Sequence, residues 1–141
     1  MTDRSFLPPE DEPQVVSEMR NRGAYVQPAH SLLAKEDPKF LKAYAELAQQ
    51  SFRHGEGSGD EGLTELHREL VVIGILAFRG GSEESLISHL ERALSLGASR
   101  RDLIGVFEAA VVPGGAPAML NGLRALMGLE DRQSDQGEEA V

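Results

Sequence analysis

Apolar residues recur along most of this chain at intervals of three and four, the spacing that places them on one face of an α-helix. Such stripes lie in five segments, at residues 38–52, 63–79, 82–96, 99–111 and 119–127. Glycine and proline separate the segments, and no run has the strict apolar–polar alternation of a half-buried strand. The pattern therefore predicts an all-α fold.

The expected helices begin and end at residues that satisfy backbone groups left open at helix ends. Asp37 and Thr64 are placed to accept hydrogen bonds from the first N–H groups of two helices, as N-caps. Ser99 and the residue three positions later, an Asp in place of the usual Glu, have the spacing of a capping box. Gly97 stands where a glycine ends the preceding helix. The last helix is expected to end near Gly128.

The segment from Val71 to Phe78 is apolar almost all round, which is typical of a helix buried on more than one side. Gly74 inside it costs roughly 1 kcal/mol of helix propensity relative to Ala, and a close helix–helix crossing would explain its presence. Gly80-Gly81 predicts a tight turn, so the helices on either side should form an antiparallel hairpin. A short chain has difficulty burying such a helix alone, so the segment also predicts an oligomer interface.

Composition divides the chain into three parts. Residues 1–28 are acidic and proline-rich, and we expect a mobile N-terminal segment in which residues 15–22 could form a short helix. Residues 29–129 predict a single helical domain, and residues 130–141 predict a disordered acidic tail. Within the domain, the glycine-rich residues 54–62 indicate a flexible linker, with a mobile lid over a pocket as the alternative.

The formal net charge of −9 is concentrated at the two ends of the chain. The body between them is close to neutral and has no basic stripe with interleaved aromatic residues, so nucleic-acid binding is not expected. No stretch of about 18 or more apolar residues is present, which predicts no membrane span. The first residues lack the features of a signal peptide, so we expect a cytoplasmic protein.

The chain contains no cysteine. Disulfides, thiolate metal ligands and thiol redox chemistry by this chain are therefore excluded. No pair of histidines has the spacing of a zinc site, so a metal site is not expected.

His89 is the strongest candidate for chemistry. In a helix it shares one face with Ser82 and Ser85, and Leu86 and Leu90 flank it on the stripe expected to be buried. An imidazole at an apolar seam is a candidate acid or base, because burial and neighbouring groups can move its proton affinity through neutral pH. The alternative is a core histidine hydrogen-bonded to a backbone carbonyl, which is an ordinary arrangement.

Several short pieces of the chain keep a characteristic order and spacing. They are Arg-Glu-Leu-Val at 68–71, His-Leu-Glu-Arg-Ala-Leu at 89–94, Gly-Ala-Ser at 97–99, Asp102, and Gly-Ala-Pro-Ala at 115–118. With these pieces, the chain from about Leu63 to Leu129 resembles the carboxymuconolactone decarboxylase family, also called alkyl hydroperoxidase D-like. The upstream residues 33–38 also fit the helix that precedes this core in many members.

The resemblance implies an alkyl hydroperoxidase D-like helical bundle of antiparallel hairpins, which in this family typically assembles into trimers or hexamers. The peroxidase branch has a Cys-x-x-Cys-x-x-x-His motif, and Ser82, Ser85 and His89 occupy those positions here. A serine hydroxyl cannot form a disulfide or reduce a peroxide, so peroxidase activity is excluded. Ser82 also has the position of a helix N-cap. The chain is closer to the cysteine-free branch, whose decarboxylases use no cofactor.

The parent reaction of that branch removes CO₂ from a small lactone acid whose conjugated carbonyl accepts the electrons. By this resemblance His89 would donate a proton to carbon, and Glu69 would orient the imidazole or exchange protons with it. Ser85 could hydrogen-bond the imidazole or the substrate, and Arg68 or Arg79 could hold a carboxylate of a small organic acid or lactone. Each arginine has the alternative of facing solvent, and Glu69 that of an ordinary ion pair with an arginine.

The positions of the two central candidates are compatible with contact. Counted from the hairpin, Glu69 lies about 15 Å and His89 about 10 Å along their helices, at 1.5 Å per residue. Antiparallel packing could bring two long side chains together from those heights.

A second interpretation belongs to a different class: a catalytically silent helical oligomer that serves as a binding or scaffold protein. The missing cysteines favour it, and so does Pro113, which stands where the family often has a tyrosine. The two interpretations differ in what they require of the fold. An enzyme needs a closed polar pocket that contains both Glu69 and His89, whereas a His89 wedged among leucines with no cavity beside it would argue against catalysis.

Overall fold

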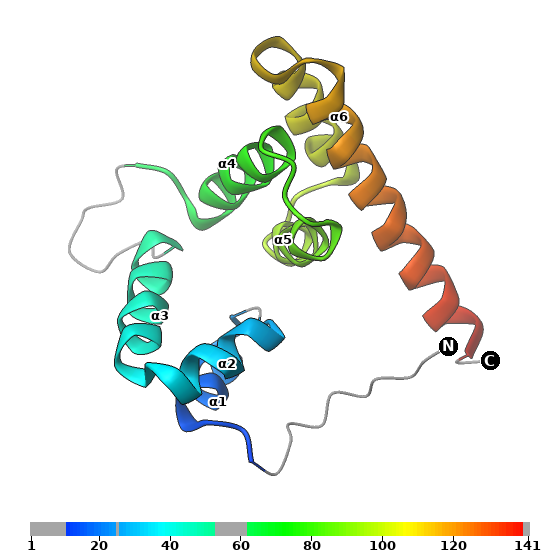
Figure 1. Cartoon of the computed structure of the whole chain (residues 1–141). Helices are drawn as coiled ribbons and strands as arrows, with labels where there is room; N and C mark the ends of the chain where they lie inside the picture. The colour runs from blue at the N-terminus through cyan, green and yellow to red at the C-terminus, as the bar shows by residue number, and fades with distance from the viewer. Residues whose placement is uncertain (1–10, 25, 53–61, 140–141) are drawn as a thin grey trace. The chain divides into compact units, whose positions relative to one another are not determined.

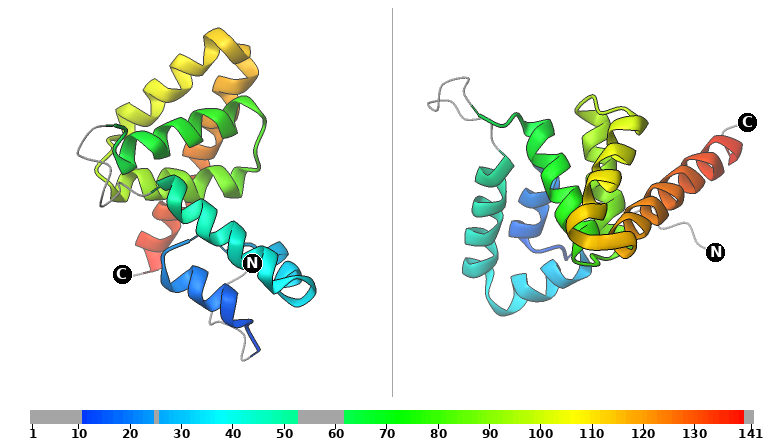
Figure 2. Two further views of the ribbon diagram at one scale, coloured as in Figure 1. Left: turned by 90° about the vertical axis from the view of Figure 1, so that its left-hand side faces the viewer. Right: turned by 90° about the horizontal axis from the view of Figure 1, so that it is seen from above.

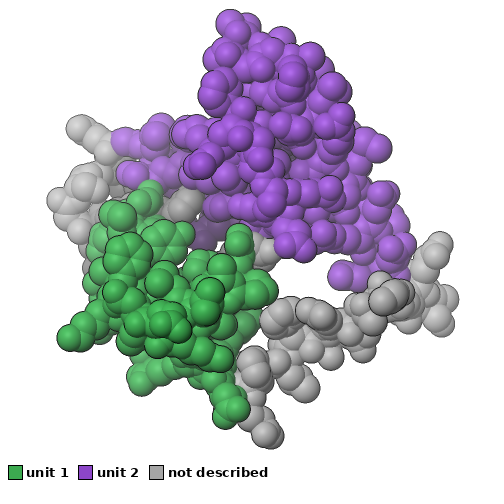
Figure 3. Space-filling view, in the orientation of Figure 1, with its two compact units in different colours: residues 1–51 green, residues 52–141 purple. Residues whose placement is uncertain are grey.

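The computed structural model describes residues 11–24, 26–52 and 62–139, and within these ranges the secondary structure consists of helices and turns (Figure 1). The predicted all-α fold is confirmed. The helices group into two compact units, residues 1–51 and 52–141 (Figure 3). The boundary falls inside the range 29–129 for which a single domain is expected, and the extent of an independently folding domain stays a prediction. Residues 1–10 and 53–61, which include most of the expected glycine-rich linker, lie outside the described residues.

The first unit contains α1 (Gln14–Asn21), α2 (Pro28–Glu36) and α3 (Pro38–Phe52). The short helix expected at 15–22 is therefore present as α1. The backbone N–H of Phe40 donates to Asp37 Oδ1 at 3.0 Å, which confirms the predicted N-cap of α3. A small apolar core holds the unit together and consists of Val16, Met19, Ala34 and Leu41.

His30 has a structural role at the start of α2. The backbone N–H of Gln27 donates to His30 Nδ1 at 2.9 Å, and the imidazole stacks on Tyr44 of α3 with ring centroids 6.0 Å apart. Burial lowers the pKa of His30, because the charged imidazolium is less well hydrated at this partly buried position than in water. The ring accepts a hydrogen bond at Nδ1 only while that nitrogen carries no proton.

The second unit begins with an antiparallel hairpin of α4 (Glu65–Phe78) and α5 (Glu83–Ser95), which lie side by side in Figure 2. Thr64 Oγ1 accepts from the N–H of His67, and Ser82 Oγ accepts from the N–H of Ser85, so both predicted N-caps are confirmed. Gly80 lies in the connection with a φ of 71°, a left-handed conformation that favours glycine. The tight turn expected from the two glycines is therefore observed.

The last helix, α6 (Arg100–Glu139), is interrupted once. Gly115 has a non-helical conformation with φ 68° and ψ −175°, and there the chain turns back on itself (Figures 1 and 2). The two arms pack closely, because a Cβ built on Gly122 would lie only 2.1 Å from the ring of Phe107. The break expected between Pro113 and Pro117 is thus confirmed.

The chain beyond residue 128 differs from the expectation of a disordered tail. The helix does not end near Gly128 but continues to Glu139, with the side chains of residues 131–137 exposed. Gly128 lies inside the helix, with Glu83 and Ile87 of α5 packed where a Cβ would stand, so this glycine permits close packing rather than ending the helix. Arg100 pairs with Glu130 and helps to fix the extension against the first arm.

The second unit buries its apolar stripes between α4, α5 and both arms of α6. A Cβ on Gly74 would lie 3.3 Å from Val106, so the glycine predicted at a close helix crossing is indeed at one, between α4 and α6. Reciprocal hydrogen bonds between Ser99 and Asp102 confirm the predicted capping box of α6. The core consists mainly of Ile73, Ala77, Leu86, Ile87, Leu90, Ala93, Leu103, Phe107, Ala125, Leu126 and Leu129.

One helix of the described chain, Arg100–Gly137 within α6, is long and apolar enough to cross a membrane by length and composition alone. Core helices of soluble proteins pass the same test. Here the interruption at Gly115 folds the segment into two packed arms, which is not a continuous span. The absence of a membrane span and the cytoplasmic location stay predictions.

Candidate functional site

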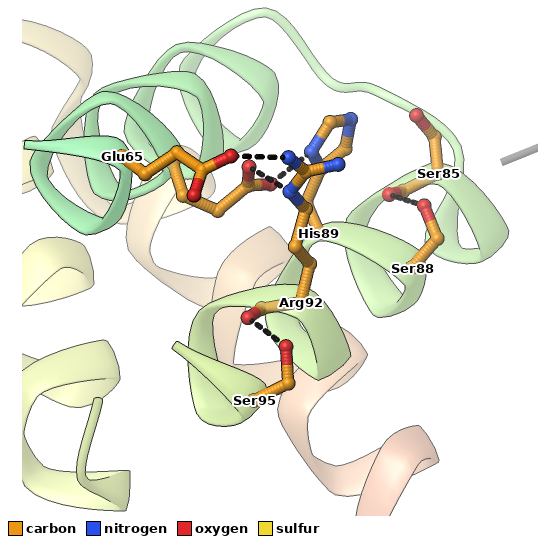
Figure 4. A network of polar contacts seen from close by, with 7 residues as sticks. Glu65, Ser85, Ser88, His89, Arg92 and Ser95 are labelled. Carbon is orange, nitrogen blue, oxygen red and sulfur yellow. Dashed lines mark hydrogen bonds and ion pairs between the residues drawn. The ribbon is translucent and has the colours of Figure 1, made fainter. Parts of the chain in front are cut away.

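The α4–α5 hairpin brings four charged or titratable side chains into one cluster. Glu65 and Glu69, one turn apart on α4, face His89 and Arg92, which are three residues apart on α5 (Figure 4). Among the described residues, Glu69 is a fully buried charged residue of the second unit, with 0% of it exposed. We call these four residues the charged cluster.

Glu69 and His89 are in direct contact. The carboxylate accepts a hydrogen bond at Oε1 from Nδ1 of the imidazole, across the two antiparallel helices. The Glu69 side chain is fully buried, whereas 24% of the His89 side chain is exposed. His89 therefore lies at the edge of the buried stripe formed by its neighbours Leu86 and Leu90. At Nδ1 its partner is the Glu69 carboxylate.

Arg92 was not predicted as a site residue, and the structure places it at the centre of the cluster. Its Nε lies 3.3 Å from Glu69 Oε2, and its Nη2 donates to Glu65 Oε1 at 3.0 Å. The residue spacing in the sequence could have indicated that Arg92 and Glu65 belong to the site. Arg92 follows His89 by three residues and Glu65 precedes Glu69 by four, so each pair shares a helix face.

The other predicted site residues, which are Ser85, Arg68 and Arg79, lie outside the charged cluster. Ser85 lies one turn before His89, where its backbone N–H donates to Ser82 and its carbonyl accepts from Ser88. Arg68 donates from Nε to the carbonyl of Leu63 at 3.2 Å. Arg79 is exposed at the C-cap of α4, about 15 Å along the helix from Glu69, so the structure does not bring it to the cluster.

The arrangement suits proton transfer. A buried carboxylate that accepts from Nδ1 fixes the imidazole's orientation, and Nε2 is then the ring nitrogen that could exchange a proton with a bound molecule. Within the described ranges, no group of three or more His, Asp or Glu side chains has a geometry that could hold a metal ion. The chemistry that Glu69 and His89 themselves can supply is acid–base catalysis.

The chain belongs to the carboxymuconolactone decarboxylase family, because the model of that family matches residues 38–127, well over half of its length. The matched range contains all four residues of the charged cluster. No curated protein is similar enough in sequence to match the chain.

Two solved structures are similar in fold. One is a carboxymuconolactone decarboxylase family protein from Legionella pneumophila in its apo form, with a TM-score of 0.61 and 20% identity, covering 83% of this chain and 92% of that one. The other, from Burkholderia xenovorans LB400, is named as a candidate carboxymuconolactone decarboxylase, with a TM-score of 0.66 and 18% identity, covering 87% and 93%. At these identities the likeness shows the fold alone, and it confirms the predicted family fold.

Proposed function

We propose that this chain is a cofactor-free enzyme that decarboxylates a small organic acid or lactone through an enolate. The single observation that carries the proposal is the fully buried Glu69 carboxylate against the partly exposed imidazole of His89. Burying a carboxylate costs several kcal/mol unless it is paired, and apolar residues of similar size would often stabilise a core as well. A buried charge beside a titratable group at the edge of the core is therefore typical of a functional site.

The reaction needs one proton and no external oxidant or reductant. The bond between the carboxylate carbon and its neighbour breaks, CO₂ leaves, and the electron pair moves into a conjugated carbonyl to form an enolate. Protonated His89 then donates a proton from Nε2 to the substrate carbon, and the imidazole regains a proton from solvent before the next turnover. Glu69 keeps the ring oriented and stabilises the imidazolium through Nδ1.

The direct test is CO₂ release from 4-carboxymuconolactone and a panel of related keto and lactone acids. We expect turnover by the wild type and a loss of about 10² to 10⁴-fold in His89→Gln, the usual contribution of a positioned proton donor. His67→Gln is a matched control, because His67 is an exposed histidine of α4 outside the charged cluster. Equal turnover in His89→Gln would remove His89 from this role, and no release from any compound would contradict decarboxylation.

We further propose that the chain forms a homo-oligomer, a trimer or hexamer, through α4. Val71, Ile75 and Phe78 follow one another at intervals of four and three, so they share a helix face, and each is about half exposed. Grouped large apolar side chains on a surface are typical of an interface. The same observation supports the alternative function, a catalytically silent oligomer that serves as a scaffold.

Light scattering of Ile75→Glu tests the assembly. Because 55% of Ile75 is exposed, the substitution leaves the core of the unit intact, and we expect it to convert an oligomer into monomers with unchanged helical content. Gln133→Glu adds the same charge at an exposed position of α6 and should leave the assembly unchanged. A wild-type monomer at micromolar concentration contradicts the proposal. An intact oligomer that turns over none of the panel would favour the silent scaffold.

A further inference from the structure

The charged cluster pairs one buried carboxylate with two different cations. Arg92 and His89 contact separate oxygens of Glu69, Oε2 and Oε1 respectively. A guanidinium stays charged at every physiological pH, whereas an imidazole gains and loses its charge near neutrality. We propose that Arg92 is a positioning residue: it serves as the permanent counter-ion of Glu69 and thereby leaves His89 able to take up and release a proton.

The need for a permanent counter-ion follows from the burial of Glu69. A fully buried carboxylate without a partner is strongly destabilising, so its charge must be compensated at all times. If His89 were its sole cationic partner, each proton that His89 gave to a substrate would leave Glu69 uncompensated. With Arg92 3.3 Å from the second oxygen, the carboxylate keeps a counter-ion through both protonation states of His89.

Glu65 holds the guanidinium in place from its other side. Its Oε1 accepts from Arg92 Nη2 at 3.0 Å, and it stands one turn before Glu69 on α4. Arg92 is thus held between two carboxylates of the same helix, with 34% of its side chain exposed. This contact with Glu65, drawn in Figure 4, directs the guanidinium toward α4, where its Nε lies 3.3 Å from Glu69 Oε2.

Among the described residues, the charged groups of the cluster that includes His89 come from both helices of the hairpin. From α4 these are Glu69 and, through Arg92, Glu65, while α5 itself supplies Arg92. The third element, α6, meets α5 on another side, where Gly128 lies beside Ile87 and Glu83. Arg92 thus compensates the charge of Glu69 whether or not His89 is protonated, which is what the proposed proton donation requires.

The proposal is tested by NMR titration of His89 in the ligand-free protein, with its signal identified by its loss in His89→Gln. Without Arg92 the buried Glu69 must take its counter-charge from His89, so in Arg92→Met the titration midpoint should move to higher pH by about half a unit or more. Arg92→Lys keeps the charge and should titrate with the wild type. An unchanged midpoint in Arg92→Met, or an equal shift in Arg92→Lys, would overturn the assignment.

Arg101→Met is the matched control. Arg101 forms a forked ion pair with Glu108 at 2.8 and 2.9 Å, but that pair is exposed on α6, and its removal should not change the His89 titration. A control shift as large as that of Arg92→Met contradicts a local role for Arg92.

A second variant keeps the proposal testable if Arg92→Met does not fold. The double substitution Arg92→Met/Glu69→Gln removes the buried charge together with its counter-ion, so it should recover the helical circular dichroism of the wild type. Failure to recover would overturn the proposal. The inference rests on the proposed function for its purpose, but the titration uses no substrate. If the His89 midpoint shifts in Arg92→Met but the wild type releases no CO₂, the role of Arg92 as counter-ion is supported. Only the proposed decarboxylase activity is then contradicted.

Discussion

His30 in the first unit and His89 in the second use the same ring atom in opposite ways. His30 Nδ1 accepts a hydrogen bond from a backbone N–H, whereas His89 Nδ1 donates to a carboxylate. The first arrangement requires a neutral ring and serves to start a helix. The second persists when the ring is charged and is typical of proton transfer. The group that faces Nδ1, more than burial, decides which role a partly buried histidine can take.

The largest effect on this comparison should come from Glu69→Gln. The amide oxygen can still accept from Nδ1, but the negative charge beside the imidazolium is lost, so a smaller fraction of His89 should carry the proton that the reaction needs. We expect CO₂ release from 4-carboxymuconolactone to fall about 10²-fold or more. Glu108→Gln removes an exposed, paired carboxylate of α6 and is the matched control.

The comparison of the two histidines also has a spectroscopic readout that needs no substrate. In the wild type, ¹⁵N NMR above the titration midpoint should find the proton of His89 on Nδ1 and that of His30 on Nε2, the opposite tautomers that their partners require. Full turnover in Glu69→Gln would contradict the role of the carboxylate in proton transfer. The same tautomer at both histidines would contradict the opposite use of Nδ1 in His30 and His89.

A smaller effect is expected from pH at His30. Because burial lowers its pKa below the ordinary value near 6.5, the unfolded chain binds more protons at this residue than the folded unit does. The contribution of His30 to stability is therefore fully present above about pH 6.5 and decreases as the pH falls below it. Hydrogen exchange of the α2 amides, corrected for intrinsic rates, should show less protection at about pH 5.5 than at about pH 7.5.

The variant His30→Gln tests whether His30 causes this pH dependence. A glutamine three residues into a helix can take the place of the imidazole in the capping box with Gln27, but it does not titrate. The variant should keep the protection of α2 and lose its pH dependence. An unchanged pH dependence would assign the effect to another group of the first unit.

Local chemistry explains which features the sequence could predict. Asp37, Thr64, Ser82 and the Ser99–Asp102 pair were found because a cap links residues two or three apart, and such a bond depends little on the rest of the fold. The Glu69–His89 contact needed one further assumption, the antiparallel hairpin, which the glycine turn supplied. Periodicity alone predicts only the all-α class. The family resemblance added the particular arrangement, a bundle of antiparallel hairpins.

The features that were missed depend on packing between helices. Arg92 looked like one of many surface arginines until α4 placed two carboxylates beside it. Gly128 looked like a helix end, because the sequence does not reveal that α5 occupies the space of its missing side chain. The charge of Arg79 suits a ligand for a substrate carboxylate, but its position at the far end of α4 places it outside the charged cluster.

The construction of the charged cluster from one hairpin has a consequence for how the protein folds. Its contacts join residues 20 and 27 positions apart, from Glu69 to His89 and from Glu65 to Arg92, so only a short loop must close to form them. Chains dominated by such local contacts fold quickly. We expect the hairpin to form before the distant second arm of α6 docks, so the carboxylate meets its counter-ions while water still surrounds it.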